Sequence, residues 1–191
     1  TIWASQTNDI LIGSNDKDVI YGYGGDDTFT GNSGNDTLFG GNGDDTFIST
    51  GSNDGSDVID GGANDLKGDT VDYSSISRVG DGTTGGINVT LNGSTNATVI
   101  VSLGNNDTIV NIENVTGTAN NDTIYGDSNA NTLIGNAGDD TFRGGTGNDY
   151  LDGGAGEDTA DYSYSAAAIN VNLSDTLVVA TIDSNSDGNF T

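Results

Sequence analysis

The chain has 191 residues and a formal net charge of −25, because 29 acidic side chains stand against only 4 basic ones. This charge excludes nucleic acid and anionic membrane surfaces as partners, since both would repel the chain. Only 32% of the residues are hydrophobic and 31 are glycine, which excludes a conventional globular core. A chain of this composition is expected to stay disordered unless a ligand stabilises it.

Several residue types that carry catalysis or cross-links are missing from the sequence. There is no histidine, cysteine, methionine or proline, and neither a GxSxG nor an HExxH motif is present. The chain therefore lacks the usual bases and nucleophiles, and it is not expected to be an enzyme. No apolar run of about 18 residues predicts a membrane-spanning helix, so membrane insertion is not expected. The repeat pattern described next is already running at both ends, which suggests a piece of a longer protein.

From Ala4 onward the sequence repeats every nine residues. The nonamers at 22–30, 31–39 and 40–48 read GYGGDDTFT, GNSGNDTLF and GGNGDDTFI, with Asp in the sixth position and a large apolar residue in the eighth. Alternation such as TFT is typical of a strand, and a period of nine cannot be one face of a helix. Each nonamer therefore predicts a six-residue loop followed by a short strand. Residues 4–21 keep this register with fewer glycines.

The repeat places like charges on top of one another. Two nonamers with strands on opposite walls make one coil, and coils stack at the strand spacing of ~4.8 Å. Asp27 would then lie beside Asp45, and two such charges repel by several kcal/mol at an effective dielectric of about 20. A cation between them removes the conflict. Carboxylate and carbonyl oxygens, in a chain without sulfur ligands or imidazole, select calcium, and glycine lets the loops turn their carbonyls inward.

The repeat is interrupted after Ile48. The register slips by two residues, resumes with Asp57, and the first block closes with Asp69 in GDTVDYS. Residues 74–107 lose the nonamer but contain two alternating runs, 87–91 and 99–103, on either side of an Asn-Gly turn signal. We expect these runs to form strands that cover or extend the walls built by the repeats.

The first block also carries apolar residues that would point outward. They occupy the seventh and ninth nonamer positions and are Ile10, Ile12, Val19, Tyr21, Phe39 and Ile48. An exposed apolar patch of this kind usually has a partner. We expect the spacer to pack on this patch through Ile87, Val89, Val99 and Val101.

A second block begins with Glu113, nine residues before Asp122, and continues in five nonamers from Gly117 to Asp161. Asn131 stands where Asp is expected and offers a carbonyl oxygen without a charge. Residues 156–173 then repeat features of the first spacer. The expected organisation is a first block at 4–72, a β-rich spacer at 73–107, a second block at 108–161 and the start of a truncated second spacer at 162–191.

The nonamers resemble the GGxGxDxUx repeats of RTX, or hemolysin-type, proteins, which are secreted bacterial toxins, proteases, lipases and adhesins. The resemblance covers both blocks, and many copies in register are far more specific than a single GGxGxD. It implies an all-β fold, a right-handed parallel β-roll (a β-solenoid), with Ca²⁺ bound between loop n and loop n+2. About seven or eight ions are expected on this basis.

The resemblance also implies the ligands. The lower loop offers its second and fourth carbonyls and its Asp, and the upper loop its first and third carbonyls and its Asp. The alternative is that these Asp residues only make Asx turns, as single Asn-Gly or Asp-Gly loops do. The expected metal ligands of the first block are Ser5, Thr7, Asp9, Ser14, Asp16, Asp18, Gly22, Tyr23, Gly24, Gly25, Asp27, Gly31, Asn32, Ser33, Gly34, Asp36, Gly40, Gly41, Asn42, Gly43, Asp45, Asp57 and Asp69. Those of the second block are Thr118, Asn120, Asp122, Asp127, Asn129, Asn131, Gly135, Asn136, Ala137, Gly138, Asp140, Gly144, Thr146, Asp149, Gly153, Ala155 and Asp158.

Residues 183–188, DSNSDG, are a separate signal. They fit the opening of a DxNxDG calcium loop, although the chain ends before a closing Glu could follow. A plain polar turn is the alternative.

Two functional classes fit these observations. The first is a calcium-binding structural module of a secreted or cell-surface bacterial protein, most simply a large adhesin exported through a type I channel, as the resemblance implies. The second is the calcium-binding tail of a secreted protease, lipase or alginate epimerase, which would aid folding or hold polysaccharide. The expected partners are calcium ions, with carbohydrate or neighbouring domains of the same chain as further candidates, and the chain is expected to be a monomer. Ice binding, which needs regular Thr and Asn at loop positions three and five, is not supported, because only Thr146 with Asn148 matches.

Overall fold

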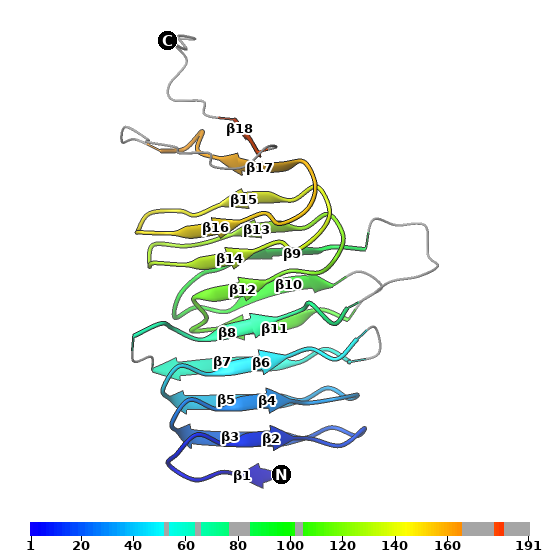
Figure 1. Ribbon diagram of the computed structural model, residues 1–191. Coiled ribbons are helices and arrows are strands. Elements are labelled where there is room, and N and C mark those ends of the chain that lie inside the picture. Colours follow the sequence, from blue (N-terminus) through cyan, green and yellow to red (C-terminus); the bar gives the residue numbers. More distant parts are fainter. Residues whose placement is uncertain (52–53, 64–65, 77–84, 102–104, 166–177, 182–191) are drawn as a thin grey trace.

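In a computed structural model of the protein, the chain winds into a coil whose two walls are a long and a short β-sheet (Figure 1). The structure describes residues 1–51, 54–63, 66–76, 85–101, 105–165 and 178–181. Within these ranges the chain forms strands and turns and no helix, so none is long and apolar enough to cross a membrane. The predicted all-β parallel roll is confirmed.

The walls differ in length. The long sheet contains, in spatial order, β1 (Ile2–Trp3), β3 (Val19–Gly24), β5 (Thr37–Asn42), β7 (Val58–Ala63), β11 (Asp107–Val110), β10 (Ala97–Val101), β9 (Ile87–Thr90), β13 (Thr123–Tyr125), β15 (Thr141–Arg143), β17 (Asp158–Asp161) and β18 (Val178–Thr181). The short sheet contains β16 (Tyr150–Asp152), β14 (Thr132–Ile134), β12 (Asn114–Thr116), β8 (Thr70–Asp72), β6 (Thr46–Ile48), β4 (Thr28–Thr30) and β2 (Ile10–Ile12).

The register of the repeats builds the core. Strands one coil apart pair in parallel, so eighth-position residues stack on one another, as Phe29 does on Phe47. The rings of these two residues lie 4.6 Å apart between centroids, and both side chains are buried. The seventh and ninth positions point outward because side chains alternate along a strand. One apolar cluster therefore runs through both blocks, from Leu11 to Phe142.

The spacer extends the long wall. Strand β9 pairs in parallel with β13, and β10 runs back antiparallel to both β9 and β11 (Figure 1). The returning chain then lays β11 beside β7, which restores the parallel order. On the short wall β8 pairs directly with β12, so the two inserted strands have no counterpart there. Tyr73, Ile76, Leu91 and Ile112 are buried and belong to the core cluster.

The prediction that the spacer packs on the outward apolar patch is wrong. Val89 and Val99 are fully buried in the core, and Ile87 and Val101 also face it, while Ile10 and Ile12 remain 79% and 60% exposed. The reason is that β9 and β10 have a single apolar face. Because that face closes the core between the two blocks, the outer face of these strands keeps one large apolar side chain, Ile100, which is itself 50% exposed.

Some sequence-based predictions lie outside the described residues. They are the end of the run 99–103, the loop 183–188 and most of the second spacer at 162–191.

We predict that the core is stabilised by ordinary burial once the roll is formed. In saturating calcium, Leu133→Ala should destabilise the fold by about 2–5 kcal/mol, because Leu133 is fully buried in β14. The matched control Ile10→Ala removes an aliphatic side chain that is 79% exposed, so it should cost no more than about 0.5 kcal/mol. Chemical denaturation of both variants measures the difference, and equal losses would contradict the core assignment.

Candidate metal sites

The loops stack along two edges of the roll. We call edge 1 the set of loops that lead from the long to the short sheet, and edge 2 the set that leads back. The described residues of edge 1 are 4–9, 22–27, 40–45, 61–63 with 66–69, 111–113, 126–131 and 144–149. Those of edge 2 include 13–18, 31–36, 49–51 with 54–57, 117–122, 135–140 and 153–157.

The sixth-position Asp residues form a column on each edge. The backbone N–H of Asp9 donates to Oδ1 of Asp27 at 2.8 Å, and the N–H of Asp27 donates to Oδ1 of Asp45 at 2.8 Å. The N–H of Asp45 continues the column to Oδ1 of Asp69 at 2.7 Å. Each carboxylate in the column thus uses one oxygen to fasten the coil below it. The sequence prediction that these Asp residues lie side by side is confirmed for this set.

Edge 2 repeats this arrangement. Its hydrogen bonds run from the N–H of Asp18 to Asp36, from Asp36 to Asp57, from Asp122 to Asp140 and from Asp140 to Asp158.

The second carboxylate oxygen is left without a partner at five of these positions. The Oδ2 atoms of Asp27, Asp36, Asp45, Asp69 and Asp140 are buried and accept no hydrogen bond. The five side chains are at most 1% exposed. A buried charged oxygen without a partner is costly, so these atoms mark places where a cation would stabilise the fold.

First-position glycines leave the space that such a cation needs. A Cβ added to Gly22 would overlap both Oδ2 of Asp27 and the carbonyl oxygen of Gly40. A Cβ on Gly40 would overlap Oδ2 of Asp45 and the carbonyl oxygen of Gly61 in the same way. Carboxylate and carbonyl oxygens therefore converge on one small space between successive loops. This is the oxygen donor set that calcium prefers, so the residues present fit the ion.

Burial raises the pKa of these carboxyl groups. Desolvation is the main cause, and neighbouring carboxylates of the column add to it. The pKa of Asp45 is raised to about 6, that of Asp140 to about 7, and those of Asp57 and Asp69 to about 8. Within the described ranges, no three acidic side chains gather around one point. A bound cation would therefore depend on backbone carbonyls for many of its ligands.

The loop backbone has the conformation that the sequence suggested. Gly25 has a φ of +99°, which glycine adopts easily, whereas Tyr23 adopts +71° without being glycine. For the predicted site between 22–30 and 40–48, the structure brings Asp27 and Gly40 together. The carbonyl oxygen of Asn42 accepts a hydrogen bond from the N–H of Gly25 at 2.9 Å, so one of its lone pairs is already used.

The predicted site in the second block shows the same features. Oδ2 of Asp140 and the carbonyl oxygen of Gly153 meet in front of Gly135. The carbonyl of Ala155 accepts from the N–H of Gly138 at 2.9 Å, which corresponds to the bond at Asn42. Asn136, like Tyr23, has a positive φ, here +79°.

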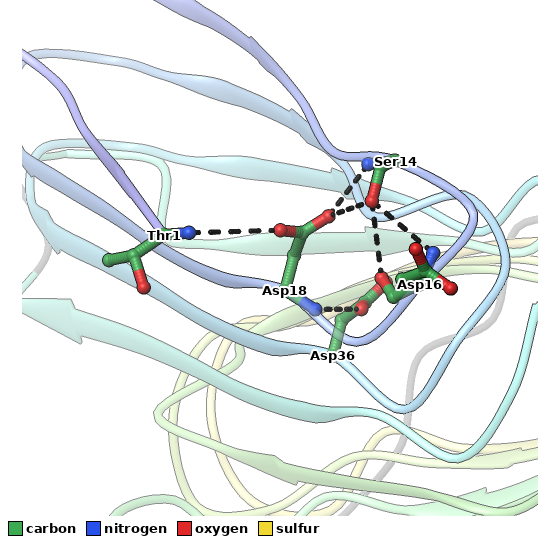
Figure 2. Close-up of polar contacts among 5 residues, drawn as sticks. All are labelled: Thr1, Ser14, Asp16, Asp18 and Asp36. Atoms are coloured by element: carbon green, nitrogen blue, oxygen red, sulfur yellow. Dashed lines mark hydrogen bonds and ion pairs between the residues drawn. The ribbon is translucent and has the colours of Figure 1, made fainter.

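Three loops satisfy their sixth-position Asp residue internally. In loop 13–18, both the N–H and the hydroxyl of Ser14 donate to Oδ2 of Asp18, at 2.7 and 2.8 Å (Figure 2). Ser5 does the same for Asp9, and the pKa of Asp9 and that of Asp18 are lowered mainly by these bonds. Figure 2 also shows the amino terminus of Thr1 3.8 Å from Oδ1 of Asp18. These Asp residues are thus satisfied within their own loops, but by donors four residues before them and not by the N–H two residues after them that an Asx turn would use.

The loop 117–122 belongs to the same class, because Thr118 donates through its N–H to Oδ2 of Asp122 at 2.7 Å and through its hydroxyl to Oδ1 at 3.0 Å. Serine or threonine at the second loop position therefore closes the loop locally. This signal was visible in the sequence. The predicted ligand Asp16 lies in such a loop, where its N–H donates to the Ser14 hydroxyl at 3.2 Å.

Asn131 occupies the sixth nonamer position, so a side-chain amide stands there in place of a carboxylate. Its Oδ1 accepts from the N–H of Asp127 at 3.0 Å, and its Nδ2 donates to the carbonyl of Glu113 at 2.8 Å. Its own N–H donates to Oδ1 of Asp149 at 3.1 Å, which keeps the column in register. The amide hydrogens thus replace part of what a cation would do.

Sequence reasoning missed Asp107 as a member of the columns, and it placed Glu113 in the repeat register without assigning it as a metal ligand. Asp107 continues edge 2, because the N–H of Asp57 donates to its Oδ1 at 2.9 Å. Glu113 continues edge 1, because the N–H of Asp69 donates to its Oε2 at 3.0 Å. The triplet Asp-Thr-Ile at 107–109 is the ordinary end of a nonamer and could have revealed Asp107. At Asp107 the second oxygen is not free, since the buried Tyr73 hydroxyl donates to it at 2.9 Å.

Comparison with known families agrees with this geometry. The family model described as RTX calcium-binding nonapeptide repeat matches the chain in four copies, at residues 3–38, 21–55, 111–141 and 125–160. Together these matches span more than half of the chain. No curated protein matches it.

We predict that Asp residues inside a column matter more than those at its end. Asp27 is bonded to the coils on both sides of it and has a buried free oxygen, whereas Asp158 is bonded through its carboxylate to Asp140 alone. Asp27→Ala should therefore raise the calcium midpoint of folding more than Asp158→Ala. Asn131→Asp should lower the midpoint by restoring a charged ligand. Circular dichroism over a calcium titration measures each midpoint, and equal midpoints for the two Ala variants would contradict the site map.

We also predict that acid partly replaces calcium. In the calcium-free fold the pKa values of Asp45, Asp57, Asp69 and Asp140 are raised to between about 6 and about 8, so protonation favours the folded over the unfolded chain. This stabilisation is complete below the unfolded pKa of about 3.9 and is lost as the pH rises through 6 to 8. The calcium-free chain should gain β-sheet signal between pH 8 and pH 5. An unchanged spectrum over this range would contradict the burial of these carboxyl groups.

Proposed function

The chain belongs to the RTX calcium-binding nonapeptide repeat family, and we propose that it is a calcium-dependent structural module that folds outside the bacterial cell. One observation carries the proposal. Five buried carboxylate oxygens without a partner lie in the two loop columns, and those of Asp27, Asp45, Asp69 and Asp140 each lie beside a carbonyl oxygen of a neighbouring loop.

Calcium, when bound, supplies the positive charge that the stacked carboxylates lack. The ligands on edge 1 are the carboxylates of Asp27, Asp45 and Asp69 with the loop carbonyls beside them. On edge 2 they are Asp36, Asp57 and the pair Asp140 and Asp158. The number of ions would be about seven or eight.

Folding would be linked to free calcium because the ions bind only the folded chain. With a net charge of −25 and 32% hydrophobic residues, burial alone does not offset the chain entropy of folding. Extracellular calcium modules bind in the range of ~0.1–1 mM. The chain would therefore stay unfolded in a bacterial cytoplasm and fold outside it, which keeps it threadable through an export channel.

The larger protein would be a surface adhesin exported through a type I channel. Support comes from the tandem arrangement, in which a block of nonamers is followed by a β-rich spacer and then by a second block. Such units suit a long extracellular stalk whose neighbouring domains lie on the same chain. A catalytic domain beside this module would instead assign it to a secreted enzyme, so the flanking sequence decides between the two.

We predict a calcium-driven transition from a disordered chain to a β-roll. Circular dichroism of the chain in excess chelator at pH 8 should show a disordered spectrum, and a calcium titration should produce a β-sheet spectrum with a steep midpoint. Magnesium at the same concentration is the control, and it should not produce the transition, because it keeps its own water shell and demands a stricter geometry. A β-sheet spectrum that persists in chelator at pH 8 would overturn the proposed function.

A further inference from the structure

The two blocks meet on edge 1 at a loop of only three residues, 111–113. The segment from Gly61 to Asp69 is longer in sequence than the usual six loop residues, whereas the short loop keeps only the acidic sixth position of the nonamer, as Glu113. The spacer hairpin also contacts this place, because the N–H of Asn111 donates to the carbonyl of Gly93 at 2.9 Å.

Asp69 is the last Asp that the first block contributes to edge 1, and it is the most completely buried one. Its side chain is 0% exposed, and its Oδ2 has no hydrogen-bond partner. Its N–H donates to Oε2 of Glu113 at 3.0 Å, in the same way that the N–H of Asp45 donates to Oδ1 of Asp69 at 2.7 Å. Glu113 thus takes the next place in the column. The additional methylene of glutamate compensates for the shorter loop.

Asn111 supplies the matching carbonyl. A Cβ added to Gly61 would overlap Oδ2 of Asp69 and the carbonyl oxygen of Asn111, just as one added to Gly40 would overlap Oδ2 of Asp45 and the carbonyl of Gly61. Asn111 adopts a φ of +53°, which asparagine tolerates better than most residues. Its side-chain Nδ2 donates to Oδ1 of Asp60 at 2.8 Å and holds this conformation.

We propose that this junction is a further calcium site, formed by the carboxylates of Asp69 and Glu113 and the carbonyl oxygen of Asn111, and that it joins the two blocks. The proposal rests on the proposed function, because it assigns one more ion of the same kind. It differs from the other sites in that one of its loops is not a nonamer loop and its upper acidic ligand is a glutamate.

The surroundings give an ion access and further oxygen ligands. A polar hollow of about 670 Å³ lies beside the short loop. Asn111 and Glu113 line one part of it, and Asp127, Ser128 and Asn129 of the second block line another. Asp69 itself does not line the hollow, so an ion would pass from the hollow inward to the buried carboxylate.

The site would tie the blocks together because Glu113 forms hydrogen bonds with residues of both. Its side chain bonds to Asp69 of the first block, and its backbone carbonyl accepts from Nδ2 of Asn131 in the second at 2.8 Å. The next residue, Asn114, begins β12, which pairs with β8 on one side and β14 on the other. A cation bound here would therefore stabilise edge 1 at its shortest loop.

Native mass spectrometry in saturating calcium tests the proposal by counting bound ions. Glu113→Gln should bind one ion fewer than the unmodified chain and should fold at a higher calcium concentration. Glu157→Gln is the matched control, because Glu157 is exposed and bonds only through its backbone N–H, to Oδ1 of Asp139 at 2.9 Å. It should keep the full ion count and the original midpoint.

A second variant separates loss of the ion from loss of the fold. Glu113→Lys places an ammonium beside Asp69, so it should fold with one ion fewer than the unmodified chain and at a lower calcium midpoint than Glu113→Gln. An ion count equal to that of the Glu157→Gln control in either Glu113 variant would overturn the proposal. Failure of both variants to fold would also overturn it, because Glu113 would then act through its hydrogen bond and not through a cation. If the unmodified chain bound no calcium, the proposed function itself would fail, which is a distinct outcome.

Discussion

Stacked carboxylates at the spacing of β-strands are the constraint on which this fold depends. The register that places Phe29 on Phe47 in the core also places Asp27 next to Asp45 on the edge. The chain cannot have one without the other, because both follow from the same repeat. Each added coil buries one more pair of apolar side chains and brings in two more carboxylates. Every coil that extends the core therefore also adds carboxylate oxygens that need a partner.

Two kinds of hydrogen-bond donor satisfy the second carboxylate oxygen at some of these positions. Where the loop has Ser or Thr in its second position, the hydroxyl and the N–H of that residue serve the oxygen, as Ser14 does for Asp18. At Asp107 the buried hydroxyl of Tyr73 does so from the spacer. These internally closed positions lie at the start of each block and at the junction. The unpartnered oxygens lie in the interior of the columns, where each carboxylate is buried and has stacked neighbours.

The parts of the fold that could be predicted are those that depend on local periodicity. The three-residue strands, the buried eighth positions and the Asp columns all follow from a single nonamer repeated in register. The position of β9 and β10 could not be predicted, because alternation shows that a strand has one apolar face but not which open edge it will join. The register of Glu113 could be read from the sequence, but its contact with Asp69 could not, because its short loop is placed beside the first block only by the pairing of β11 with β7.

The junction shows how an interrupted repeat can still fold as one body. The long wall gains two strands that the short wall lacks, so the two blocks could have separated into independent rolls. They do not, because Ile59 pairs with Ile109 and Val71 with Val115 across the interruption, and the core cluster is continuous. The loop column on edge 1 crosses the same point through Asp69 and Glu113. Apolar contacts and the charged column thus pass through the junction together, and a calcium-driven transition that begins in one block would be transmitted to the other.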